Sequence, residues 1–174
     1  MSDIVNANIL FIAAMYVNFI GSLLRNLYFK YVIKVIKAAF YVLAFYYLGG
    51  VTGVVFYSLY MLNILFQTLH LSKYTLTKIF FSILTVVTFI FFKEYHVIDI
   101  IMYLLFISFF WVRAFIKKTN TLTKYRLVKK SIIAVYAYMV SAYTLAIYEL
   151  SSVVFYFVSD AIKKLTDYTN KKTS

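Results

Sequence analysis

Residues 38–69 read AAFYVLAFYYLGGVTGVVFYSLYMLNILFQTL, a run of 32 residues without a single charged side chain. One straight helix of that length would extend about 48 Å, whereas the hydrocarbon core of a bilayer is about 30 Å thick. The segment must therefore turn back, and Gly49, Gly50 and Gly53 lie together where a turn costs least. These residues predict two membrane-crossing helices, at about residues 32–48 and 51–69.

The other apolar segments extend this pattern along the whole chain. They are predicted to cross the bilayer at about residues 4–24, 75–92, 97–115, 131–148 and 150–166. The span at 75–92 has the weakest signal, because Lys78 would have to extend its ammonium group to the headgroups. The last two spans are predicted to be joined by a tight hairpin at Glu149. We expect an all-α polytopic membrane protein with seven transmembrane helices in a single membrane domain, residues 1–174.

The composition supports a membrane protein and excludes several classes of site. Apolar residues make up 64% of the chain and charged residues only 14%, compared with about a quarter in a soluble domain. The chain has no cysteine, which excludes a disulfide scaffold, a cysteine-ligated metal site and a thiol nucleophile. Since no catalytic or cofactor motif stands out, we expect no enzyme activity, no cofactor and no bound metal.

The net charge of +12 indicates membrane topology and not nucleic-acid binding, because the basic residues form short clusters between apolar runs. Seven spans place 17 of the 18 Lys and Arg residues on the face that also holds the C-terminus. Only Lys93 lies on the opposite face. By the positive-inside rule, we expect the N-terminus outside and the C-terminus in the cytoplasm.

The chain also matches itself at a shift of 99 residues. This shift places residues 54–57 (VVFY) on 153–156 (VVFY) and Lys30 on Lys129. We therefore expect a first three-helix repeat at 4–69, a linker helix at 75–92, a second three-helix repeat at 97–166 and a cytoplasmic tail at 167–174. One linker helix gives the two repeats the same orientation, which is a parallel repeat.

The chain resembles a known family of small membrane proteins. The segment FYYLGGVTG at residues 45–53, followed by Asn63, is similar to small bacterial inner-membrane proteins of the YgjV type. The 3+1+3 helix layout resembles that of the SWEET, PQ-loop and PnuC superfamily. The resemblance implies a small-solute transporter in the bacterial cytoplasmic membrane. The chain departs from this pattern in having no proline, so rocking would have to use Gly21, the Gly49–Gly50 turn or helix interfaces.

Asn63 and Asp160 are the candidate substrate-binding residues. Asp160 lies 11 residues, or about 16 Å, into the last predicted helix, and Asn63 lies 12 residues into its own. An ionisable group at such a depth usually faces a cavity or a partner. SWEET transporters hold their sugar between a facing polar pair on these two helices, and the resemblance assigns that role to Asn63 and Asp160. Alternatively, Asp160 forms an ion pair with Lys164 and Asn63 bonds to a neighbouring helix.

Other polar residues have weaker functional interpretations. Asn18 and Gly21 share one face of the first helix, which favours helix packing in support of a site. Asp99 enters the fifth span from outside and is a candidate for an external mouth, although a solvated acid at a helix start is the commoner case. A basic stripe at the start of the second span is typical of headgroup anchoring, with a basic rim for an anionic solute as the alternative: Lys30, Lys34 and Lys37.

Two functions follow from these observations. The first is a transporter of a sugar, a nucleoside or a similar small solute, which exposes a midplane site alternately to each side. The second is a non-transporting scaffold or receptor whose basic cytoplasmic loop, Lys117 to Lys130, docks an acidic partner. The expected partners are the lipid bilayer and a small-molecule solute, without nucleic acid, and a homo-oligomer is compatible with the sequence.

Overall fold

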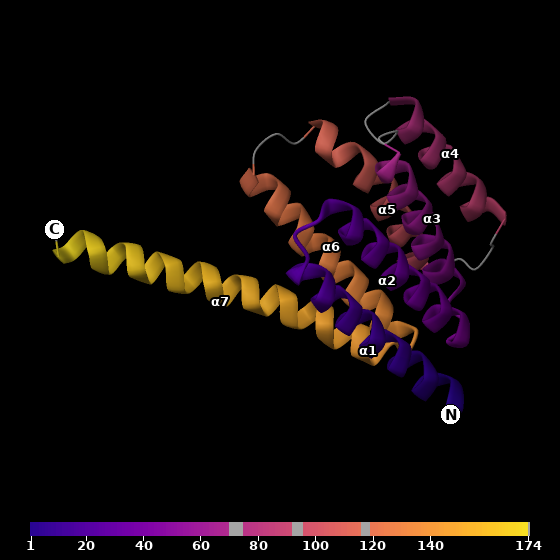
Figure 1. Cartoon of the computed structure of the whole chain (residues 1–174), viewed down its shortest axis with the longest axis horizontal. Coiled ribbons are helices and arrows are strands. Elements are labelled where there is room, and N and C mark those ends of the chain that lie inside the picture. Colours follow the sequence, from indigo (N-terminus) through magenta and orange to yellow (C-terminus); the bar gives the residue numbers. More distant parts are fainter. Residues whose placement is uncertain (70–74, 92–95, 116–118, 174) are drawn as a thin grey trace.

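The computed structural model describes residues 1–69, 75–91, 96–115 and 119–173, and within them all regular secondary structure is α-helical (Figure 1). Long apolar segments favour helices because a helix satisfies its backbone hydrogen bonds internally. The helices are α1 (Ser2–Leu23), α2 (Leu27–Tyr47), α3 (Val51–Thr68), α4 (Thr75–Phe91), α5 (Val97–Phe115), α6 (Thr119–Met139) and α7 (Tyr143–Thr173).

Three of these helices are long and apolar enough to cross a membrane: α1, α3 and the Tyr143–Ile162 part of α7. Helix α4 and the Val97–Phe109 part of α5 are apolar but shorter. The all-helical prediction is thus confirmed and is compatible with a membrane location, while the seven spans stay a prediction. Lys93, the one external basic residue of the predicted topology, lies outside the described residues.

The helices pack in two groups of three. Helix α2 lies between α1 and α3, and α6 lies between α5 and α7, while α4 packs against α3 and α5. The two groups meet where α1 contacts α7 and where α3 contacts α5. The backbones of α2 and α6 stay apart over the described residues, so that side chains and space fill the middle of the molecule. Figure 1 shows α7 continuing well beyond the other helices to the C-terminus.

The turn predicted at residues 48–53 is confirmed. Helix α2 ends at Tyr47, and Gly49 adopts φ +67°, a left-handed conformation that glycine takes without a steric penalty. The Gly50 N–H donates to the carbonyl of Phe45 at 2.9 Å, and the Gly49 N–H donates to that of Tyr46 at 3.1 Å. These two bonds close the end of α2 in the manner of a Schellman motif and allow α3 to begin at Val51.

The second hairpin corrects the prediction of a turn at Glu149. The turn lies at residues 140–142, where Ser141 has φ 62° and the Ala142 N–H donates to the carbonyl of Ala137 at 2.7 Å. Glu149 lies two turns into α7 instead. A charged residue in an apolar run suggests a surface turn, but here the carboxylate is buried within the bundle and forms an ion pair with Lys130.

The two hairpins therefore correspond at a shift of 92 residues and not 99. Gly49 corresponds to Ser141, and the hydrogen bonds of the first turn recur in the second at equivalent positions. The two shifts differ by seven residues, which is about two helical turns. The 99-residue match therefore pairs residues on the same face of equivalent helices, but at different distances from their turns. At the 92-residue shift, Asn63 corresponds to Phe155 and not to the vicinity of Asp160.

The last two helices are also longer than predicted. Helix α6 begins at Thr119 and not at Ser131, so residues 119–130 of the predicted basic loop are helical. Lys117 and Lys118, which began that loop, lie outside the described residues. Helix α7 runs to Thr173, so residues 167–173 of the predicted tail continue the helix. Apolarity marks only the part of a helix that avoids water, whereas helix formation continues into charged sequence.

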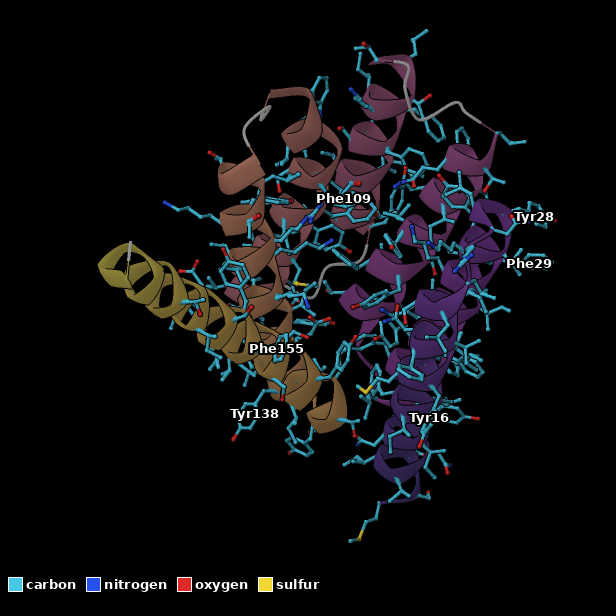
Figure 2. All side chains as sticks on the ribbon, turned by 60° about the vertical axis from the view of Figure 1, so that its left-hand side comes forward. Tyr16, Tyr28, Phe29, Phe109, Tyr138 and Phe155 are labelled. Carbon is cyan, nitrogen blue, oxygen red and sulfur yellow. The ribbon has the colours of Figure 1, made fainter. Side chains whose placement is uncertain are left out.

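Large apolar side chains also cover much of the outer surface. Tyr16, Tyr28, Phe29 and Tyr138 are exposed and point away from the helices in Figure 2. Phe109 lies between the helices instead (Figure 2). An outer surface this rich in exposed aromatic and aliphatic groups is compatible with a lipid environment.

Candidate functional site

A cavity of about 280 Å³, here called the central cavity, lies between the two groups of helices. Helices α2, α3, α5, α6 and α7 all contribute to it, so it forms only when both groups are in place. Its walls combine aromatic rings with charged groups: Tyr41, Phe56, Tyr57, Tyr60, Phe109, Tyr125, Lys37, Arg126, Lys129, Lys130 and Glu149 line it, together with Ala38, Val112, Leu122 and Ile133. Aromatic walls with a few polar groups are typical of small-molecule sites.

The two hairpins place side chains at matching levels in this cavity. Tyr41 and Tyr57 each lie eight residues from Gly49, on either side of the first turn. Ile133 and Glu149 each lie eight residues from Ser141, on either side of the second. Because a helix rises 1.5 Å per residue, all four lie about 12 Å from their turns. All four also line the cavity, so the 92-residue correspondence extends into the candidate site.

Lys37 and Lys129 also occupy equivalent positions, one helical turn further from their hairpins. Each lies twelve residues before the left-handed residue of its hairpin, which is about 18 Å along the helix, and each lines the cavity. The Lys37 ammonium donates to Asn18 Oδ1 at 3.2 Å and lies 5.3 Å from the centre of the Tyr41 ring. The Asn18 amide in turn donates to Tyr148 Oη at 3.3 Å. Asn18 therefore holds Lys37 in place from α1.

Lys129 is held by aromatic rings. Its ammonium lies 4.3 Å from the centre of the Phe109 ring and 6.0 Å from the rings of both Phe56 and Tyr60. Such cation–π contacts stabilise an ammonium group by about 0.5–2 kcal/mol, most strongly where water is excluded. The side chain is thus kept inside the cavity, although its residue number places it in the predicted loop.

Glu149 is the only acidic side chain among the described residues that line the central cavity. Its Oε2 lies 3.5 Å from the Lys130 ammonium, and it also interacts electrostatically with Lys37. A carboxylate in a poorly solvated site needs such opposite charges, because the cost of burying it alone is several kcal/mol. Counting Lys37, Arg126, Lys129 and Lys130 as cations, the walls carry three more positive than negative charges.

Two polar atoms of the cavity wall are buried and make no hydrogen bond within the described chain. They are Tyr41 Oη and Glu149 Oε2, whose residues are 2% and 8% exposed. An unsatisfied buried polar group costs about 1–3 kcal/mol, so proteins rarely keep one unless water or a ligand satisfies it. The hydroxyl of Tyr41 can donate and accept, whereas Glu149 Oε2 can only accept when ionised.

Three buried rings in mutual contact, here called the aromatic layer, lie on the hairpin side of the central cavity: Phe45, Tyr57 and Tyr136. The Phe45 ring stacks on Tyr57, with centroids 5.5 Å apart and planes inclined by 13°, and lies 5.7 Å from Tyr136. The Gly53 N–H donates to Tyr136 Oη at 2.7 Å. This bond joins α3 to α6 and satisfies one of the backbone donors left open at the start of α3.

Gly53 is required for this arrangement. A Cβ at its position would lie 2.5 Å from the Cγ and Cδ1 atoms of Phe45, closer than carbon atoms approach without displacement. The absence of a side chain therefore lets Phe45 pack directly on the first turn of α3.

A second cavity, here called the hairpin cavity, lies beyond the aromatic layer and has a volume of about 470 Å³. Both hairpin turns line it, with Tyr136, Thr52, His96 and Asp99 among the other residues. Tyr136 faces the hairpin cavity, Tyr57 faces the central cavity, and Phe45 packs between these two rings. One layer of side chains thus separates two cavities along the boundary between the helix groups.

The predicted substrate pair is not brought together at the central cavity. Asn63 is buried on α3, and Asp160 is half-buried on α7, 19 residues beyond Ser141. Neither lines the central cavity, and α3 does not pack against α7 in the described chain. Asn63 lies 14 residues beyond Gly49, so Asp160 is about 7.5 Å further from its turn.

The other predicted site residues lie at helix contacts or at the hairpin cavity. Gly21 lies against α2, where a Cβ would collide with the side chain of Ile33. Asn18 contacts both Lys37 and Tyr148 and so supports the wall of the central cavity. Asp99 is buried and lines the hairpin cavity.

The sequence alone gives Lys129, Lys130 and Glu149 no role in binding a solute. It places Lys129 and Lys130 in a basic loop, which marks topology or docks an acidic partner, and it places Glu149 at the turn. Their one available signal was spacing, because Lys37 and Lys129 are 92 residues apart, as are Gly49 and Ser141. That signal is recognisable only once the second turn is known to lie at Ser141.

Comparison of the chain with protein-family models, with curated proteins and with solved structures gives no match. The resemblance to YgjV-type and SWEET-like proteins therefore stays a prediction from motif and layout.

Proposed function

We propose that this chain is a membrane transporter of a small solute, which passes between the two three-helix groups by alternating access. The observation that carries the proposal is the pair of cavities at the boundary between the groups, separated by the aromatic layer. A solute site at such an interface, which opens to one side at a time, is the arrangement on which transporters with internal repeats rely. The central cavity is also of a size that suits a small molecule.

The predicted topology gives the two cavities their sides. With the hairpin turns outside, the hairpin cavity faces outward, and the central cavity extends from the aromatic layer towards the cytoplasmic half, where Arg126 and Leu122 line it. The structure described here would then be closed to the outside by the rings of Phe45, Tyr57 and Tyr136. Outward opening would separate α6 from α3 and break the bond between Gly53 and Tyr136.

The proposed motion is a rocking of one helix group against the other at their shared boundary. The chain has no proline to act as a hinge, and the turns at Gly49 and Ser141 each lie within one group, so the motion uses the helix contacts between the groups. The backbones of the two groups approach each other where α1 meets α7 and where α3 meets α5, and side-chain contacts such as that of Tyr136 with Gly53 add to this boundary. Rocking about these contacts would leave each group of three helices intact.

Thiol accessibility tests the proposal directly, because the chain has no native cysteine. Thr52→Cys places a thiol in the hairpin cavity, and Tyr60→Cys places one in the central cavity. In proteoliposomes, a membrane-impermeant maleimide should label these positions from opposite sides. Adding Tyr136→Phe, which removes the bond between the groups, should increase labelling at 52 and decrease labelling at 60.

Reciprocal change is the signature of alternating access. A scaffold that docks an acidic partner, the alternative function from the sequence, has no reason to exchange accessibility between two internal cavities. If labelling at both positions rises together or does not change, the transport proposal is wrong.

The transport proposal can also be tested for where the solute binds, either at Asn63 and Asp160 or in the central cavity. If Asn63 and Asp160 hold the solute, Asn63→Ala should weaken solute retention by the purified protein, and Asp160→Asn should change the pH dependence of uptake. If the central cavity holds it, substitutions at Lys37 and Lys129 should have the larger effect.

A further inference from the structure

We propose that the solute is a small hydroxylated organic anion, such as a hydroxycarboxylate or a sugar phosphate, whose anionic group binds between Lys37 and Lys129. This inference rests on the proposed transport function and names its substrate class. It depends on three features of the central cavity: its charge, the matched positions of the two lysines, and its unsatisfied polar atoms.

The charge of the cavity indicates an anion. Among the described residues, four basic side chains line the walls and only Glu149 opposes them. Arg126 is exposed, whereas Lys37, Lys129 and Lys130 are half-buried, where like charges repel more strongly than in water. Binding one negative group would lower that repulsion, whereas a cationic solute would increase it. The cationic walls thus favour anions over neutral molecules and exclude simple cations.

The matched positions of Lys37 and Lys129 indicate where the negative group binds. The two residues occupy equivalent levels on α2 and α6, the central helices of their groups. Each ammonium has a support that keeps it in the cavity, the amide of Asn18 for Lys37 and the ring of Phe109 for Lys129. An oxyanion held by both lysines would join the two helix groups, which is what couples binding to rocking.

The unsatisfied atoms indicate that the anion also carries hydroxyl groups. Glu149 Oε2 is buried in the wall and lies 3.5 Å from the Lys130 ammonium but accepts no hydrogen bond, and Tyr41 Oη makes none within the described residues. A ligand hydroxyl can donate to the carboxylate, and another can accept from the tyrosine. An anion without hydroxyl groups offers Glu149 no hydrogen-bond donor, so a polyhydroxylated chain or ring fits better.

The size and the walls agree with this class. A volume of about 280 Å³ corresponds to about nine water molecules at about 30 Å³ each, which is enough for a six-carbon solute. The rings of Tyr57 and Tyr60 supply flat apolar surface for its C–H groups. A long acyl chain would not fit, although a lipid headgroup with phosphate and hydroxyls shares the same chemistry.

Equilibrium binding to the purified full-length chain tests the inference. The protein is placed in nanodiscs of phosphatidylcholine, and gluconate, sorbitol and inorganic phosphate are titrated in turn by calorimetry. Gluconate combines charge with hydroxyls, sorbitol is its neutral analogue, and phosphate is an anion without carbon-bound hydroxyls. We expect gluconate to bind at least tenfold more tightly than either of the others.

Lysine variants link that binding to the proposed position. Lys37→Gln and Lys129→Gln should each weaken gluconate binding at least tenfold. Lys124→Gln is the matched control, because Lys124 is exposed on the same helix as Lys129 and does not line the cavity, and it should leave the affinity unchanged. Circular dichroism of each variant verifies that the helices are retained.

The outcomes separate this inference from the transport proposal. If sorbitol binds as tightly as gluconate, if no probe binds, or if Lys37→Gln and Lys129→Gln bind gluconate like the control, the anion assignment is wrong. Reciprocal thiol labelling would then still support transport of another solute. If binding occurs without reciprocal labelling, the site is an anion site and the transport proposal fails.

A final arm distinguishes a soluble anion from a lipid headgroup. Nanodiscs with phosphatidylglycerol present a phosphate with two hydroxyls in the bilayer itself. If this lipid weakens gluconate binding by the wild type, the same site accepts the headgroup, which supports the ligand chemistry and assigns it to the lipid. If the affinity does not change, the soluble anion is the ligand.

Discussion

Tyr136→Phe removes one oxygen atom from the aromatic layer and leaves its ring in place. The lost hydroxyl accepts the Gly53 N–H at 2.7 Å, within a region where Tyr136 is 1% exposed. Gly53 lies in the first turn of α3, where a backbone N–H has no acceptor within its own helix, so the substitution leaves this N–H without a protein acceptor. An unsatisfied buried donor costs about 1–3 kcal/mol, so the folded-to-unfolded ratio should fall by about 5- to 150-fold. The ring volume hardly changes, so no cavity cost is added.

The assay is equilibrium unfolding of the purified protein in dodecyl maltoside micelles titrated with SDS, followed by circular dichroism. Tyr138→Phe is the matched control, because Tyr138 lies on the same helix but is 67% exposed and points outward (Figure 2). We expect the control to change the free energy of unfolding by less than about 0.5 kcal/mol. If Tyr136→Phe destabilises the protein no more than this control, the bond between α3 and α6 does not hold the layer together.

Three further predictions follow from the same structure. Gly53→Ala should reduce the free energy of unfolding by about 1–2 kcal/mol in the SDS titration, because its Cβ would lie 2.5 Å from the Phe45 ring. This overpacking outweighs the gain in helix propensity, so an unchanged free energy of unfolding would contradict the packing of Phe45 on Gly53. An impermeant thiol reagent applied outside intact cells should label Val97→Cys and spare Lys124→Cys, whereas the reverse pattern would invert the predicted topology. Asp160→Asn should leave gluconate affinity unchanged, since Asp160 does not line the central cavity; a tenfold loss would favour the sequence-based pair.

The candidate site could be predicted only in part. The sequence indicated a basic stripe containing Lys37, and it singled out Asn18, whose amide supports that lysine. It failed for Glu149, because an acidic residue in an apolar run is usually a turn, and the nearby Lys130 ammonium that makes its burial tolerable is not evident from sequence spacing. The equal depths of Asn63 and Asp160 were counted with the second turn at Glu149, whereas that turn lies at Ser141.

Apolar runs and glycines determined by themselves that the described chain is helical and where its first hairpin turns. A segment such as 38–69 has one low-energy option, a pair of helices with a turn at its glycines, since the apolar run is too long for one span and its backbone bonds must be satisfied locally. These signals are local, because each depends on the residue and its immediate neighbours.

Only the tertiary structure decided the second turn, the 92-residue correspondence and the central cavity. Ser141 adopts a left-handed conformation that serine shows infrequently, so the residue type did not predict that turn. The contacts of Tyr136 with Gly53, of Lys130 with Glu149 and of Lys129 with Phe109 join different helices. Their energies depend on distance and burial in the packed molecule, and neither quantity is a property of the sequence around any one residue.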